Sequence, residues 1–123
     1  MTRIDVKSMT TEELVNRFVL IAFDQDAAIR HDDNATYNRL FEQMETIKDE
    51  LRSRPGDQRH ALVRLFEHPN IQVRLKSAIA TLALVPDAAR HVLQGIADSR
   101  GYPQAGDAGM TLNALDRGIF EPT

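Results

Sequence analysis

The stretch His68-Pro-Asn-Ile-Gln-Val-Arg-Leu-Lys-Ser-Ala-Ile-Ala-Thr-Leu-Ala-Leu-Val85 decides the fold that this sequence predicts. It opens with a tight turn at Pro69, and Asn70 belongs to the residue types that cap the first turn of a helix. Residues 71–85 read as a helix with apolar side chains on nearly every side. Because a helix that is apolar all round must be buried between neighbours, we expect 71–85 to lie inside a stack of helices.

Helical signals recur on both sides of this segment. Thr10 and Glu13 form a capping box, and Asp57 is a capping residue directly after the break at Pro55-Gly56. No segment shows the alternation of a half-buried strand followed by a hairpin turn. The predicted helices cover about residues 11–31, 34–52, 58–67, 71–85, 87–99 and 107–117.

The order of these six helices predicts the architecture. Short loops between helices make neighbours antiparallel, so the six segments pair into three helical hairpins. A linear stack of three hairpins buries its middle layer on both sides, which suits 71–85. We therefore predict an all-α, HEAT-like, right-handed superhelix as one domain over residues 10–118. Residues 1–9 are predicted to be a flexible lead-in, 101–106 the loosest loop, and 119–123 a short tail.

Two resemblances support this architecture. The stretch 68–82 resembles a HEAT-type repeat through Asn70, the pair Val73-Arg74, and the packing residues Ala78 and Leu82. The whole chain is similar to a family of small bacterial proteins known as domain of unknown function number 2019. That similarity rests on Tyr37-Asn-Arg-Leu-Phe41, Leu51-Arg-Ser-Arg-Pro-Gly56, residues 68–84, and residues 104–115 with Gly118. It implies an armadillo-type α-α superhelix and no established activity, so it assigns no catalytic residue.

Composition removes several classes of function. The 123 residues carry a net charge of −3, which argues against general nucleic-acid binding. The absence of cysteine excludes disulfides, thiolate metal sites and cysteine nucleophiles, and it fits a reducing cytoplasm. No apolar run is long enough for a membrane span, and we see no signal peptide. We expect a cytoplasmic protein.

Neither a metal site nor a catalytic site is predicted. Five potential ligands lie within ten residues, but capping is the simpler role for two of them, and no calcium-loop glycine accompanies them. These five are Asp24, Asp26, His31, Asp32 and Asp33. The histidines show no zinc-binding spacing, and no serine lies in a nucleophile elbow. We expect no cofactor, no metal and no enzyme activity.

Four arginines gather around the turn at Pro55-Gly56, namely Arg52, Arg54, Arg59 and Arg64. They could contact phosphates or an acidic partner. No aromatic residue is interleaved with them to stack on a base. Pairing with the local acids Asp49, Glu50, Asp57 and Glu67 is therefore the favoured interpretation, and nucleic-acid binding is a minor alternative.

The leading functional hypothesis is a non-enzymatic scaffold or adaptor that binds a peptide, a helix or a small domain of another protein. Stacked hairpins form a groove lined by the second helix of each pair, here 34–52, 71–85 and 107–117. From this helix order, the predicted contacting residues are Arg39, Gln43, Lys76, Asn113 and Arg117. Two residues are assigned structural roles between layers instead: Asn70 in the turn, and Arg74, which we expect to pair with an acid or carbonyl of the next layer.

Two other hypotheses stay open. Residues 1–50 carry a net charge of −5, which would suit an immunity or inhibitor protein that neutralises a basic toxin enzyme. A nucleic-acid-directed HEAT-like protein is less favoured. At the other end of the chain, Ile119 and Phe120 are expected to pack back and cover the hydrophobic end of the stack. If they are exposed instead, they could mediate homo-oligomerisation.

Overall fold

A computed structural model describes residues 5–123 of the chain. These residues form helices and turns and contain no strand, as the sequence predicts. The elements are η1 (Val6–Ser8), α1 (Thr11–Arg30), α2 (Asn34–Ser53), η2 (Gln58–Glu67), α3 (Ile71–Ala80), α4 (Pro86–Asp98) and α5 (Gln104–Asp116). The chain divides into two compact units, residues 1–61 and residues 62–123. The single domain predicted over 10–118 stays a prediction.

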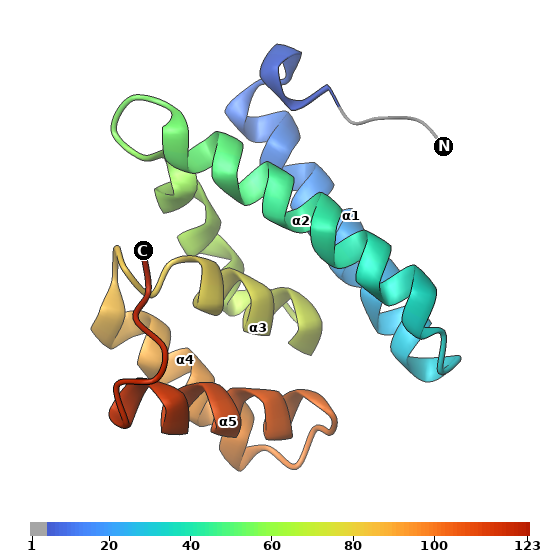
Figure 1. Cartoon of the computed structure of the whole chain (residues 1–123), viewed down its shortest axis with the longest axis vertical. Helices are drawn as coiled ribbons and strands as arrows, with labels where there is room; N and C mark the ends of the chain where they lie inside the picture. Colours follow the sequence, from blue (N-terminus) through green and yellow to red (C-terminus); the bar gives the residue numbers. More distant parts are fainter. Residues whose placement is uncertain (1–4) are drawn as a thin grey trace. The chain divides into compact units, whose positions relative to one another are not determined.

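In the first unit, α1 and α2 pack against each other as a helical hairpin (Figure 1). The capping box is present, because Thr10 Oγ1 accepts a hydrogen bond from the Glu13 N–H and Glu13 Oε1 accepts one from the Thr10 N–H. Asp33 caps α2 by accepting from the Thr36 N–H. The two helices bury their apolar positions at helical spacing: Leu14, Phe18, Ile21, Leu40, Met44, Ile47 and Leu51.

Arg54 ties the segment before α1 to the end of α2. Its guanidinium donates to the carbonyl oxygens of Val6 at 3.0 Å and Met9 at 2.7 Å. It also donates to Glu50 Oε2 at 2.9 Å, one turn earlier on α2. The predicted flexible lead-in falls partly on residues 1–4, which lie outside the described residues. Within the described residues, Arg54 contacts Val6 and Met9, and Val6 is only 9% exposed. The flexible lead-in stays a prediction.

The second unit is built around α4, which packs against both α3 and α5. The Asn70 side chain caps α3 by accepting from the Gln72 and Val73 N–H groups, as predicted. Leu75, Ala78 and Leu82 meet Leu93 and Ile96 in one apolar cluster. Phe120 packs against the same cluster, whereas Ile119 is 67% exposed. Only the second of the two tail residues therefore covers the core.

The α-helix predicted over 71–85 ends at Ala80. The Thr81 hydroxyl donates to the carbonyl oxygen of Ser77 at 2.8 Å, and residues 81–84 form turns. At this end the backbone bonds shorten to the i−3 pattern, with the Thr81 N–H donating to the Ala78 carbonyl oxygen at 3.3 Å. Pro86 acts further along, because proline disfavours the α conformation of the residue before it and has no N–H to donate. Val85 accordingly has φ −134° and ψ 64°. Leu82 still reaches the core from this turn.

The stretch 101–106, predicted as the loosest loop, contains the first turn of α5. This helix begins at Gln104, three residues before the predicted start. The Gln104 side-chain amide donates to Gln72 Oε1 on α3 at 3.0 Å, and both side chains are buried. Since a buried amide needs a partner, this pair fixes where α5 begins, a contact that local glycine and proline signals do not show.

We expect Arg54→Met to lower the free energy of unfolding by about 2 kcal/mol, because it removes charged hydrogen bonds to two backbone carbonyls and to Glu50. Urea denaturation of this variant measures the change. Arg17→Met is the control, since Arg17 is an exposed arginine on α1. Equal stability of the two variants would contradict the role assigned to Arg54.

We expect Asn70→Ala to destabilise the chain by about 1 kcal/mol, because two N–H groups in the first turn of α3 lose their acceptor. Asn113→Ala, at an exposed position inside α5, is the control and should leave thermal unfolding nearly unchanged. A matching loss of stability in both variants would show that the cap is not the cause.

Candidate functional site

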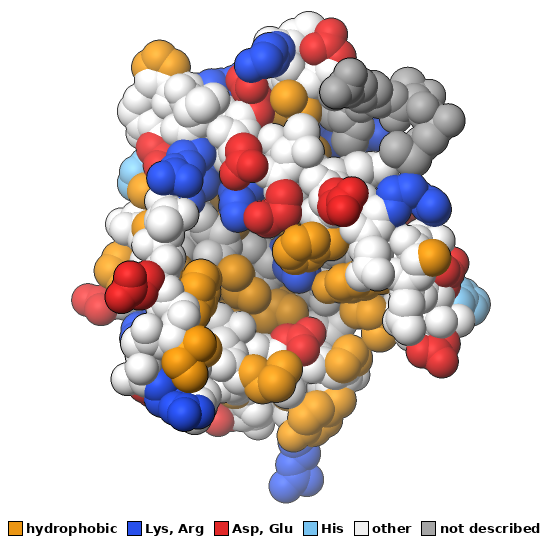
Figure 2. Space-filling view, in the orientation of Figure 1, with side chains coloured by type: hydrophobic (Ala, Val, Ile, Leu, Met, Phe, Trp, Pro, Cys, Tyr) orange, Lys and Arg blue, Asp and Glu red, His pale blue; other side chains and the backbone are white. Residues whose placement is uncertain are grey.

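The second unit has an open groove between α3 and α5, with a volume of about 390 Å³. Leu75 and Ile79 of α3 and Ala114 of α5 supply apolar lining, and Phe120 of the tail completes it. The remaining lining residues are Lys76, Asp107, Met110 and Thr111. In Figure 2, hydrophobic side chains gather over this part of the molecule. The lining of the groove is therefore mostly apolar, and Lys76, Asp107 and Thr111 are its polar members.

The position of each lining residue follows from helix geometry. Asp107, Met110, Thr111 and Ala114 are spaced by three, one and three residues, so they share one face of α5. Leu75 and Ile79 are four residues apart on α3 and also share a face. Ala108, Leu112 and Leu115 of α5 face the core, whereas Met110 on the lining face of α5 is exposed. Leu75 and Ile79 of α3 line the groove from the edge of the core itself.

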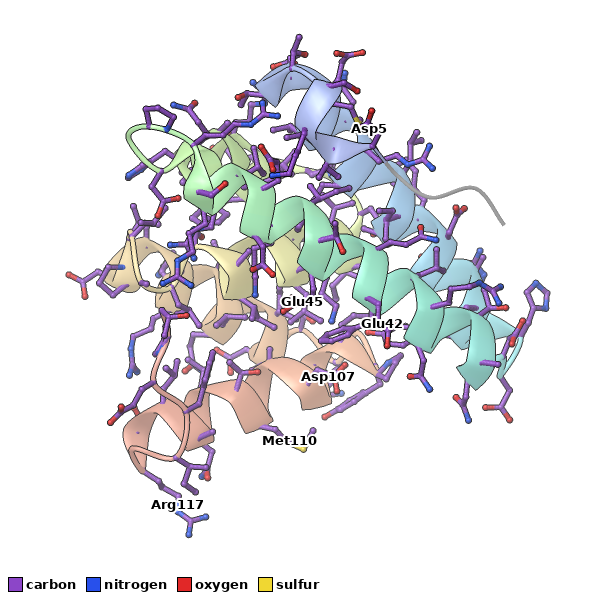
Figure 3. All side chains as sticks on the ribbon, turned by 45° about the horizontal axis from the view of Figure 1, so that its top comes forward. Asp5, Glu42, Glu45, Asp107, Met110 and Arg117 are labelled. Atoms are coloured by element: carbon purple, nitrogen blue, oxygen red, sulfur yellow. The ribbon has the colours of Figure 1, made fainter. Side chains whose placement is uncertain are left out.

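Exposure differs sharply among the apolar side chains of the groove. Leu75 is 1% exposed and forms part of the core, whereas Met110 is 67% exposed. Figure 3 shows Met110 and Asp107 on α5, with Arg117 extending from the other end of that helix. The Thr111 hydroxyl donates to the Asp107 carbonyl oxygen at 2.9 Å, so its donor is used within the helix.

The structure separates the five residues predicted to bind a partner. Lys76 lines the groove. Asn113 and Arg117 are exposed on α5 and at its C-terminal cap, but neither lines the groove. Arg39 and Gln43 lie on α2 in the first unit, where Arg39 donates to the Thr36 hydroxyl at 3.3 Å. Their role in binding stays a prediction.

Sequence reasoning missed Asp107, Met110, Thr111 and Ala114 as candidate residues. Their helical spacing is visible in the sequence, so this face of α5 could have been found. Leu112 and Leu115 of the same helix give the stronger apolar signal, and they pack on the core. Exposure of Met110 could not be read from the sequence, because methionine is usually a core residue.

The arginine cluster forms local ion pairs. Arg59 is only 4% exposed and its guanidinium donates two hydrogen bonds to the Asp57 carboxylate, at 2.9 and 2.7 Å. Arg54 is paired with Glu50. Pairing with local acids, predicted from the sequence, is confirmed for these two arginines. Arg59 is also buried, which the sequence pattern does not show.

Arg74 and His68 hold the turn before α3. Arg74 Nη1 donates to the carbonyl oxygens of His68 at 2.8 Å and Pro69 at 3.0 Å. His68 Nδ1 accepts from the Asn70 N–H at 3.0 Å. These bonds lie within one turn, so the inter-layer roles expected for Arg74 and Asn70 stay predictions. The structure shows that these hydrogen bonds hold the turn just before the first residue of α3.

Four carboxylates have lowered pKa values, each for a local structural reason. Hydrogen bonds from the Thr10 N–H lower the pKa of Glu13, and those from Thr36 lower the pKa of Asp33. The guanidinium groups of Arg54 and Arg59 lower the pKa of Glu50 and Asp57. All four groups are thus held in their charged form by a helix cap or an ion pair.

No group of three or more His, Asp or Glu side chains within residues 5–123 is arranged to hold a metal ion. Of the five candidate ligands from the sequence, Asp33 is the cap of α2, and Asp26 pairs with Arg30 at 3.0 Å. In the same described part of the chain, no helix is long and apolar enough to cross a membrane.

Comparison with known proteins places the chain in a family. A model of the family "Domain of unknown function (DUF2019)" matches residues 12–116, and the chain belongs to this family. It is similar to the crystal structure of the protein RPA1889 from Rhodopseudomonas palustris CGA009. The two share 49% sequence identity, with a TM-score of 0.94 over 98% of this chain and 100% of the other. No curated protein matches the chain.

The ion pair between Asp57 and Arg59 can be tested through the pH dependence of the free energy of unfolding. Because the pKa of Asp57 in the folded chain lies below its ordinary value of 3.8, the pair stabilises the fold fully above that value. This stabilisation is lost as the pH falls through the lower folded pKa. We expect Asp57→Asn to cost about 2 kcal/mol at pH 7, since it leaves the buried Arg59 without its carboxylate.

The difference in the free energy of unfolding between wild type and Asp57→Asn should become smaller only below pH 3.8. Urea denaturation of both proteins across this range measures it. Asp49→Asn, an exposed carboxylate on α2, is the control and should show no such narrowing. A difference that stays constant down to acid unfolding would contradict the pairing.

Proposed function

We propose that this chain is a non-enzymatic protein-binding module, and that the groove between α3 and α5 receives apolar side chains of a partner. One observation carries the proposal: Met110 is 67% exposed within a groove lined by Leu75, Ile79 and Phe120. Exposed apolar surface of this kind, bordered by polar groups, is typical of interaction sites. Methionine suits such a site because its flexible thioether adapts to different partner side chains.

The chemistry of the titratable groups supports a binding role over a catalytic one. Active sites gather groups whose pKa values are shifted toward neutral pH. Here the four shifted carboxylates move away from neutrality, and each is paired with a cap or an arginine. Lys76 and Asp107 are the titratable residues that line the groove, and the Thr111 hydroxyl beside Asp107 donates to a backbone carbonyl oxygen, not to a base.

Three finer expectations remain predictions beside this proposal. The first is a HEAT-like superhelix with one groove running along α2, α3 and α5. The second is a cytoplasmic location. The third is an inhibitor role toward a basic toxin, based on the acidic first fifty residues. The proposal needs none of them, because its groove lies wholly within residues 62–123.

The experiment is an affinity capture from lysate of the source cell with wild-type chain, Met110→Glu and Ile119→Glu as baits. We expect a stoichiometric partner that binds wild type and Ile119→Glu but is lost with Met110→Glu. The control is closely matched, because Ile119 is also apolar, 67% exposed and in the second unit, yet does not line the groove.

Thermal unfolding of the three baits must agree, so that loss of binding is not loss of folding. A partner that binds Met110→Glu as well as wild type would overturn the assignment of the groove. A partner lost only with Ile119→Glu would transfer the binding site to the C-terminal tail.

A further inference from the structure

We propose that residues 118–123 form a strap that keeps the groove of the second unit closed, and that an aromatic side chain of the partner replaces Phe120 when this strap opens. The inference rests on the proposed function, since it states how access to the same groove is regulated and which side chain of the partner enters it.

Phe120 lies between two cavities of the second unit. The groove of about 390 Å³ and a second cavity of about 460 Å³ both have Phe120 in their lining. The groove reaches Ile79 of α3 and Ala114 of α5. The second cavity continues from Leu82, in the turns after α3, and from Leu115 of α5. The two cavities therefore follow one another along the same pair of segments, and Phe120 separates them.

The structure itself shows which kind of side chain this position accepts. Phe120 packs against the core cluster, in which Leu75 lines the groove and Leu82 lines the second cavity. A buried aromatic ring contributes a large apolar contact area. An aromatic side chain of a partner can make the same contacts once Phe120 has left, and the residues beside it then meet the two cavities.

Two hydrogen bonds hold the beginning of the strap, and they share one acceptor. The N–H groups of Ile119 and Phe120 donate to the Ala114 carbonyl oxygen at 2.9 and 3.2 Å. Gly118 precedes them with φ 68°, a backbone conformation that glycine adopts readily. In Figure 1 the tail turns back from the end of α5 toward the turns that follow α3. Rotation at Gly118 therefore removes the strap while α5, which ends at Asp116, stays intact.

The strap competes with a partner for the position of Phe120. Within the strap, Phe120 and Pro122 are partly buried, whereas Ile119 and Glu121 are exposed. Because the strap is joined to α5, its phenylalanine is present at a high effective concentration beside the position that it fills. The closed strap thus lowers the affinity for an aromatic side chain from another molecule, and opening raises it.

The first measurement follows the strap in the unmodified chain by amide hydrogen exchange. Opening frees the N–H groups of Ile119 and Phe120, whereas the Leu112 N–H stays inside α5. We expect the two strap amides to exchange roughly tenfold faster than that of Leu112, at rates that low urea concentrations leave unchanged, because local opening exposes little surface. Exchange of all three at one urea-dependent rate would show that the strap leaves only on unfolding, which contradicts the proposal.

The second measurement uses a six-residue peptide with the sequence of residues 118–123 as the probe, titrated into the full chain and followed by NMR. We expect it to bind Phe120→Ala roughly tenfold more tightly than wild type, because the internal competitor is removed. Ile119→Ala is the matched control, since Ile119 belongs to the same strap but lines neither cavity. This control should bind the peptide as weakly as wild type does.

A peptide with alanine in place of its phenylalanine should bind none of the three chains. Equal binding of the original peptide to Phe120→Ala and wild type, or binding of the alanine peptide, would overturn the proposal. The exchange measurement needs no substitution, so it decides the question even if Phe120→Ala does not fold.

These results separate the strap from the proposed function. If the exchange and peptide measurements fail while a captured protein still depends on Met110, the strap is wrong and the binding module stands. If both measurements succeed but no captured protein depends on Met110, the strap stands as a property of the chain and the proposed function fails. If both hold, Phe120→Ala used as bait should retain more of the partner than wild type.

Discussion

The start of α3 depends on a small set of hydrogen bonds in the turn before it, and the geometry of the second unit follows from them. Asn70 caps the first N–H groups, while Arg74 returns to the carbonyl oxygens of His68 and Pro69. Each residue of a helix turns by 100° from the last, so a fixed start fixes which residues face which way. Leu75 and Ala78 lie in the core cluster with Leu93 of α4, and Leu75 also lines the groove beside Lys76 and Ile79.

In the first unit, arginine side chains hold the chain segments next to the helices in place. There the hairpin of α1 and α2 buries its apolar faces. Arg54 binds the segment before α1 by donating hydrogen bonds to the carbonyl oxygens of Val6 and Met9. Arg59, two residues beyond Asp57, is buried with its carboxylate partner. Breaking such a pair by removing one partner is costly because the other charge stays buried. These arginines thus act in stability, which leaves the groove as the better candidate for binding.

Core packing and solvent exposure fall on different faces of α5. Ala108 of α5 is fully buried in the core cluster, and Met110, two residues later, is 67% exposed. The exposed face of α5 can therefore vary while the core that holds the helices stays intact. The tail residue Phe120 joins both roles, because it packs on the core and also completes the lining of the groove.

The sequence by itself determined the all-α class, the positions of the helices and several of their caps. It could do so because caps and apolar spacing are local: Thr10 with Glu13, Asp33 and Asn70 act within one turn of their own helix. It also predicted the family, because motifs typical of that family occur along most of the chain. Family membership carried no activity with it, so it could not point to a site.

Only the tertiary structure decided where α5 begins, which arginines are buried, and where an apolar face stays open. The Gln104–Gln72 pair joins residues 32 positions apart, and local glycine and proline signals predicted a loop there instead. Exposure of Met110 depends on how three helices share their faces around α4, which no single helix reveals. Local hydrogen bonds depend on residues that are neighbours in the sequence, whereas the burial of a side chain depends on how the whole unit packs.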